Sequence, residues 1–132
     1  MPRTLAGIVA IAACLAAAPV VAHHSFSAEF DANKPFSVTG TVTKIEWMNP
    51  HVWFYIDVKD QAGTITNWGM EMGSPNGLMR NGWTRNSMKP GDAVTVEGSL
   101  AKDGSSRGNA RTVLLKSTGQ RLFAASSQGQ TP

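Results

Sequence analysis

The sequence predicts a mainly β fold: a five-stranded barrel with one short helix between its third and fourth strands. Three observations support this prediction. β-Branched and aromatic residues gather in five short runs, which Gly, Pro, Asn and Asp separate. Residues 52–59 alternate between aliphatic and other side chains, as a strand with one buried face does. Ser74-Pro75, after the third run, pairs a good N-cap residue with proline at the first helical position.

Each element is bounded by residues that end strands or helices. We expect strands at 36–47, 52–59, 64–72, 93–100 and 109–116, and the helix at 75–81. Gly40 is a candidate bend or bulge in the first strand, and Gly82 stops the helix. Lys89-Pro90-Gly91-Asp92 fits a type II turn before the fourth strand. A short edge strand at 120–124 is a further expectation.

This order of elements is that of the OB-fold, a Greek-key barrel with a helix between strands three and four. A small sandwich is the alternative, and the position of the helix favours the barrel. The alternation in the second strand predicts which side chains are buried. Val52, Phe54, Ile56 and Val58 should face the core, whereas Trp53, Tyr55 and Asp57 should face the other side.

The N-terminus has the anatomy of a secretory signal peptide. Arg3 supplies the positive region, residues 5–18 an apolar segment, and Val20-Val21-Ala22 a cleavage site of small residues. We expect cleavage after Ala22 and a periplasmic or secreted product. A membrane anchor is disfavoured because the apolar stretch is shorter than the roughly 20 residues of a bilayer span. Residues 11–14 resemble a lipobox ending at Cys14, but the residues that follow stay apolar.

Cleavage would leave one domain at residues 23–125, with a polar tail at 126–132 that we expect to be disordered. Cys14 is the single cysteine and leaves with the signal, so the mature chain has no disulfide and no thiolate metal site. Eleven Lys and Arg would then stand against nine Asp and Glu, without a basic run. This balance argues against nucleic acid as a partner, and no membrane span is expected in the mature chain.

Several motifs together resemble an uncharacterised family of small exported bacterial proteins. The motifs are HHSF, EFDANKP, WMNPHVWFYIDV, the GSPN and KPGD segments, and NARTVLLKSTGQRLFA. The resemblance runs from His23 to about Ala125 and implies a single exported domain, without implying an activity. More distantly, the strand order is similar to that of periplasmic bacterial OB-fold proteins, which implies binding rather than catalysis.

Three histidines form the first candidate site. Cleavage after Ala22 would place the α-amino group beside the imidazoles of His23 and His24, and His51 lies in the turn between the first two strands. Amine and imidazole nitrogens suit Cu(II) in tetragonal geometry. An arrangement of the His23 amine and ring with a third nitrogen from His51 resembles the histidine-brace copper sites of other exported proteins. A flexible terminus and a hydrogen-bonding turn histidine are the alternative.

An aromatic face forms the second candidate site. Trp53 and Tyr55 share the side opposite the aliphatic row, and OB-folds bind oligosaccharides or oligonucleotides across strands two and three. Asp57 and Glu71 are the carboxylates that could join a ligand there, or supply oxygen to a metal. The alternative is that the aromatic residues fill the small core, as we expect for two of the four tryptophans.

Catalytic motifs are not evident. No serine sits in a glycine-flanked elbow, and no glycine-rich loop suits a phosphate. The sequence therefore predicts a binding module that is not an enzyme, with Cu(II) as its expected cofactor. A module for a small organic, saccharide or protein ligand and a structural accessory of an envelope complex are the alternatives.

Overall fold

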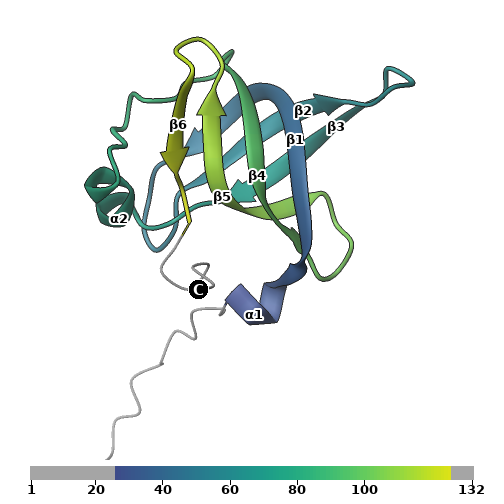
Figure 1. The fold of residues 1–132 in the computed structure, drawn as a ribbon, viewed down its shortest axis with the longest axis horizontal. Helices are drawn as coiled ribbons and strands as arrows, with labels where there is room; N and C mark the ends of the chain where they lie inside the picture. The colour runs from purple at the N-terminus through teal and green to yellow at the C-terminus, as the bar shows by residue number, and fades with distance from the viewer. Residues whose placement is uncertain (1–25, 126–132) are drawn as a thin grey trace, which may run out of the picture.

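The computed structural model describes residues 26–125, which form one six-stranded sheet with two short helices (Figure 1). The elements in chain order are α1 (Phe26–Glu29), β1 (Phe30–Glu46), β2 (Trp53–Lys59), β3 (Ile65–Glu71), α2 (Pro75–Arg80), β4 (Ala93–Ala101), β5 (Arg107–Leu115) and β6 (Gln120–Phe123). The mainly β fold is confirmed, as are the helix between the third and fourth strands and the added edge strand. The predicted signal and tail lie outside the described residues.

A ring of paired strands passes through five of the six. The sheet order is β3-β2-β1-β4-β5-β6 with antiparallel neighbours, and an additional parallel pairing of β3 with β5 closes the ring. The 17-residue β1 makes this possible because it pairs with β4 along its first part and with β2 along its second. The parallel contact is short, joining Gly69 to Arg107 and Glu71 to Asn109.

The prediction for Gly40 was wrong in its location. The irregularities of β1 fall between Asp31 and Pro35 and between Val42 and Lys44. Gly40 is instead a point of close approach, where an added Cβ would lie 2.5 Å from the carbonyl oxygen of Asp57. The first strand also begins six residues before its predicted start, because pairing with β4 orders a segment of weak β propensity.

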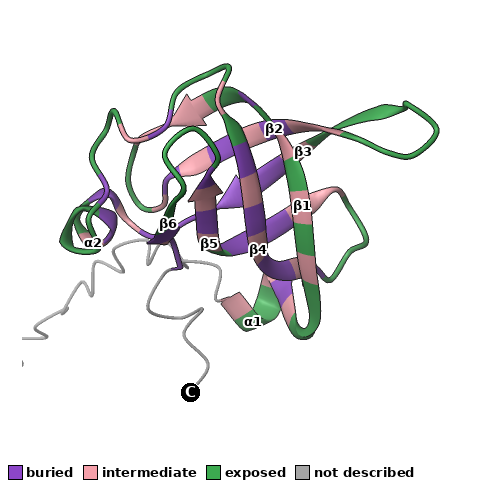
Figure 2. Ribbon diagram, turned by 45° about the horizontal axis from the view of Figure 1, so that its top comes forward, coloured by how far each residue is buried: buried purple, intermediate pink, exposed green. Residues whose placement is uncertain are grey.

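Buried and half-buried residues alternate along β2 (Figure 2). Val52, just before the strand, and Phe54 and Ile56 within it are fully buried, and Val58 packs against the same cluster. The predicted alternation is therefore confirmed. Trp83 closes one end of the core, and its indole Nε1–H donates to the carbonyl oxygen of Phe123 at 2.9 Å.

The helix and turn predictions are confirmed closely. The Ser74 hydroxyl accepts a hydrogen bond from the Gly77 amide at 3.1 Å, which caps α2, and Asn81 is the C-cap. The Asp92 amide donates to the Lys89 carbonyl at 3.1 Å, with Gly91 at φ 94°, as a type II turn requires. Among residues 26–125, no helix has the length and apolar character needed to cross a bilayer.

Two backbone hydrogen bonds connect the start of β2 with the end of the described chain. The Val52 amide donates to the Gly73 carbonyl at 3.0 Å, and the Gly73 amide donates to the Ala124 carbonyl at 2.9 Å. The end of α1 is anchored separately, because the Lys102 amide donates to the carbonyl of Glu29 at 2.8 Å. The described chain consequently begins and ends on the same side of the sheet (Figure 1).

Candidate functional site

The side chains opposite the core row of β2 form a continuous outer face with those of β3 and β5. In the strand register, Trp53 is opposite Glu71, Tyr55 is opposite Gly69, and Asp57 is opposite Asn67. The parallel pairing extends two of these rows, since Gly69 neighbours Arg107 and Glu71 neighbours Asn109. All four residues predicted to meet a ligand, Trp53, Tyr55, Asp57 and Glu71, therefore lie on this outer face.

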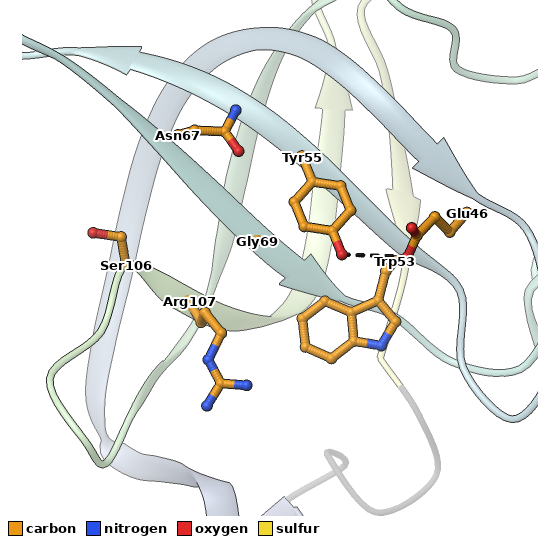
Figure 3. A pocket seen from close by; sticks show the side chains of 7 residues that line it. All are labelled: Glu46, Trp53, Tyr55, Asn67, Gly69, Ser106 and Arg107. Atoms are coloured by element: carbon orange, nitrogen blue, oxygen red, sulfur yellow. Dashed lines mark hydrogen bonds between the residues drawn. The ribbon is translucent and has the colours of Figure 1, made fainter.

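A pocket of about 470 Å³ opens on the outer face (Figure 3). Seven residues line it: Glu46, Trp53, Tyr55, Asn67, Gly69, Ser106 and Arg107. The Trp53 and Tyr55 rings lie on one side, the Arg107 side chain lies on the other, and Gly69 lies between them without a side chain. Of the predicted ligand residues, Trp53 and Tyr55 line this pocket, whereas Asp57 and Glu71 lie next to it.

Lys44 and Glu46 hold the Tyr55 side of the pocket. The Tyr55 hydroxyl donates to Glu46 Oε2 at 3.3 Å, and Lys44 Nζ lies 2.6 Å from Glu46 Oε1. The hydrogen bond and charge of Lys44 lower the pKa of Glu46. Burial, reinforced by the Glu46 charge, raises the pKa of the Tyr55 hydroxyl. Tyr55 thus stays neutral at physiological pH, and the Glu46 charge is balanced by its lysine neighbour.

Asp57 acts on the pocket through Asn67. The Asn67 amide nitrogen donates to Asp57 Oδ1 at 2.9 Å and to Thr43 Oγ1 at 3.2 Å. Because both amide protons are used, the Asn67 carbonyl oxygen remains as an acceptor, and it points toward the pocket (Figure 3). Asp57 therefore orients a residue that lines the pocket.

The loop before β5 orients Arg107. The Nε–H of Arg107 donates to Ser105 Oγ at 3.1 Å, and one terminal nitrogen of the guanidinium lies 3.4 Å from Asp103 Oδ2. Asp103 is in turn fixed by hydrogen bonds from the Ser105 amide and hydroxyl, which lower its pKa. The guanidinium has five N–H donors, so these two contacts leave donors for a ligand.

Gly69 is a glycine that the fold does not require. It has no positive φ, and an added Cβ would make ordinary contacts, 3.4 Å from Tyr55 Cε1 and 3.7 Å from Arg107 Cγ. At Gly98 and Gly108, by contrast, an added Cβ would overlap neighbouring atoms. Glycine inside a strand reduces its stability. The space above Gly69 is therefore better explained by the pocket than by packing.

A second group of polar side chains lies beside the pocket, at the end of β3. His51 Nδ1 is 3.3 Å from Glu71 Oε1, and the Asn109 amide nitrogen donates to the same oxygen at 3.3 Å. Glu71 and Asn109 are both buried, with 7% and 2% of their surface exposed. Burial raises the pKa of Glu71 to about 7, and the charge of Glu29 adds to the rise. The Asn109 hydrogen bond and the charge of Arg107 oppose it.

The predicted copper ligands are only partly described. His51 is placed beside Glu71, whereas His23 and His24 lie outside the described residues. Within residues 26–125, no three His, Cys, Asp or Glu side chains are grouped so as to hold a metal ion. A complete site would therefore need donors from residues 1–25.

Sequence reasoning missed five of the seven lining residues: Glu46, Asn67, Gly69, Ser106 and Arg107. Asn67 and Gly69 could have been found by counting the hairpin register outward from the loop at residues 60–63. Arg107 and Ser106 reach the pocket only through the parallel β3–β5 pairing, which no local pattern reveals. We expected two of the four tryptophans to contribute to the core, but three do. Trp83 is buried, and Trp47 and Trp68 pack against the core cluster.

The model of a family of unknown function, DUF6152, matches residues 10–110 of the chain. No curated protein matches the chain.

Proposed function

The chain belongs to the DUF6152 family, and from its site we propose that it is an exported, periplasmic binding module for a small saccharide. The observation that carries this proposal is the position of Gly69, which lines the pocket between the Tyr55 ring and Arg107 and has no side chain to fill it. A ligand there would rest on backbone, with aromatic rings on one side and hydrogen-bonding groups around it. Export rests on the signal anatomy of residues 1–22.

The chemistry of the lining favours a polyhydroxy ligand. Trp53 and Tyr55 offer apolar ring surface together with a polar edge, which suits the C–H face of a sugar ring. The Asn67 carbonyl oxygen, the Ser106 hydroxyl and the Arg107 guanidinium supply both acceptors and donors. The charges of Glu46 and Arg107 are each balanced by a neighbour, so a neutral ligand meets no unpaired charge.

Filling the floor of the pocket is the sharpest test of the saccharide proposal. Gly69→Val should fold at least as stably as the wild type, because valine suits a strand, but should weaken saccharide binding at least tenfold by occupying the ligand's space. Tryptophan fluorescence, titrated with N-acetylglucosamine, cellobiose, maltose and xylose, measures the effect. The saccharide affinity of Gly69→Ala should lie between those of the wild type and Gly69→Val.

Thr66→Val is the matched control, since it places the same side chain on an exposed position of β3 that does not line the pocket. It should bind as the wild type does. If none of the four sugars changes the fluorescence, or if Gly69→Val binds as tightly as the wild type, the saccharide proposal is wrong.

Copper binding through the mature N-terminus is a second candidate, and one observation favours it. The charge of Glu29 raises the pKa of Glu71, which contacts His51, so the start of the described chain lies near the His51 side chain. Only two residues lie between Phe26 and the expected N-terminal His23, a reach of about 10 Å when extended. The His23 amine and ring and the His51 ring would then supply three nitrogen donors for Cu(II).

Acetylation of the His23 α-amino group should weaken Cu(II) binding about 100-fold, because an acetylated amine can no longer bind the metal. His51→Ala should weaken it less, since a single donor is lost, and affinity should fall below about pH 6.5 as protons compete for the imidazoles. Calorimetric titration of protein that begins at His23, at pH 6 and pH 8, measures these effects. Equal affinity with and without acetylation would exclude the amine as a ligand.

Absence of both saccharide and copper binding would favour the remaining interpretation, a structural accessory in the envelope. The two titrations test different side chains, because Gly69 lines the pocket whereas His51 contacts Glu71.

A further inference from the structure

A second pocket, of about 350 Å³, lies where the end of β1 meets the loop between α2 and β4. Ile45 and Trp47 line it from the end of β1, and residues between 85 and 90 line it from the loop. The pocket shares no residue with the one on the outer face, which Glu46 lines. Because successive residues of a strand point to opposite sides, the two pockets open on different sides of β1.

This loop pocket has an apolar inner part and a polar rim. Met88 is buried, and Trp47 is half-buried and packs against the core cluster. A narrower cleft lined by the same two residues continues to the buried Trp83. Arg85 and Lys89, by contrast, are exposed. A ligand that fits would place an apolar body against the indole and methionine side chains and a polar group at the rim.

The rim carries positive charge that is only partly balanced. None of the lining residues, all of which belong to the described part of the chain, is acidic. Lys89 Nζ lies 3.2 Å from Asp92 Oδ1, so a neighbouring carboxylate already balances its charge. The Arg85 side chain makes no ion pair or hydrogen bond within residues 26–125. Its guanidinium therefore keeps its N–H donors, in the planar arrangement that matches a carboxylate.

Hydrogen bonds hold the loop that carries Arg85. The Thr84 amide donates to Ser87 Oγ at 2.8 Å, and the Ser87 amide donates to the Thr84 carbonyl at 3.1 Å. The turn that follows is held against β1, because the Gly91 amide donates to the Val42 carbonyl at 2.8 Å. Both walls are therefore formed before a ligand arrives, which lowers the entropic cost of binding.

We propose that the loop pocket binds an organic carboxylate with an apolar body, an aromatic or medium-chain alkyl acid, whose carboxylate pairs with Arg85 and whose body packs against Trp47. This site is additional to the saccharide pocket and uses none of its residues.

Calorimetric titration of the wild type with 2-naphthoate and with its neutral analogue 2-naphthylmethanol tests the role of the charge. The carboxylate should bind about tenfold more tightly, because only it can pair with the guanidinium. Arg85→Gln should weaken 2-naphthoate binding about tenfold and leave 2-naphthylmethanol binding unchanged. Arg111→Gln is the matched control, since it removes the same charge from an exposed position of β5 that does not line the pocket. It should bind both compounds as the wild type does.

A titration with octanoate identifies the apolar body. Tighter binding of 2-naphthoate than of octanoate would support an aromatic acid, and the reverse order would support an alkyl acid. Trp47→Leu, which keeps an apolar side chain but removes the indole, should weaken the preferred acid in either case.

Three results would overturn the proposal. The first is failure of the wild type to bind either acid, and the second is equal affinity for the preferred acid in Arg85→Gln and the wild type. The third is loss of carboxylate binding in Gly69→Val, because that variant fills the outer pocket and would place the acid there.

Discussion

Phe54→Ala is expected to lower the free energy of unfolding by about 3–5 kcal/mol. The Phe54 ring is fully buried at the centre of the core cluster, so its removal loses apolar burial and leaves a cavity. Tyr55→Ala, one position away, should cost only about 1 kcal/mol because its ring lies on the half-exposed outer face. Urea unfolding of the two variants and the wild type measures both values.

The comparison of adjacent positions is what makes this test specific to the alternation of β2. Both variants remove an aromatic ring from the same strand, so any difference in strand propensity is small. If Tyr55→Ala were the more destabilising variant, the outer face would be the core and the pocket could not exist as described.

Glu71→Gln is expected to remove most of a pH dependence of stability in metal-free protein. The pKa of Glu71 is raised from its ordinary value near 4.5 to about 7 in the folded chain. The folded state therefore binds this proton more tightly than the unfolded state does. Its contribution to stability is complete below about pH 4.5 and is lost as pH rises through about 7, by at most about 3 kcal/mol.

Several charged groups near Glu71 determine how much stability is lost as pH rises. Glu29 favours the protonated form, whereas Arg107 and a protonated His51 favour the anion, so the observed change should be smaller than the upper limit. The wild type should lose stability from pH 5 to pH 8, measured by urea unfolding with a chelator present. Glu71→Gln should show a flatter profile and be the more stable protein at pH 8.

Glu97→Gln should keep the wild-type slope in the same pH interval. Hydrogen bonds from Thr112 and Arg121 lower the pKa of Glu97, so its titration affects stability only at more acidic pH. Parallel profiles for the wild type and Glu71→Gln between pH 5 and pH 8 would show that Glu71 ionises normally in the folded chain.

Local signals predicted the local structure well. Ser74 and Pro75 fixed the start of α2, the turn at Lys89–Asp92 fixed the start of β4, and the alternation of residues 52–58 fixed the buried face. Each of these features depends on residues within a few positions of one another. Their physical causes, a capping hydroxyl, a positive φ and a strand of period two, are visible in sequence.

The site was predictable only in part, for a physical reason. Trp53 and Tyr55 follow from the alternation, but Arg107 reaches their pocket, and Asn109 reaches Glu71, only through the parallel pairing of two strands far apart in the chain. Local propensity carries no information about which distant strands meet. The same reasoning applies to Glu71, which sequence analysis treated as a ligand and the structure places between His51 and Asn109.

The hydrogen-bonded connection from Val52 through Gly73 to Ala124 has a practical consequence for handling the protein. It holds Ala124 on the side of the sheet that carries His51. A polyhistidine tag attached at the C-terminus would add imidazoles that compete for Cu(II), and one attached at the N-terminus would block the α-amino group. Copper titrations consequently need untagged protein, purified through a removable fusion whose protease leaves His23 as the first residue.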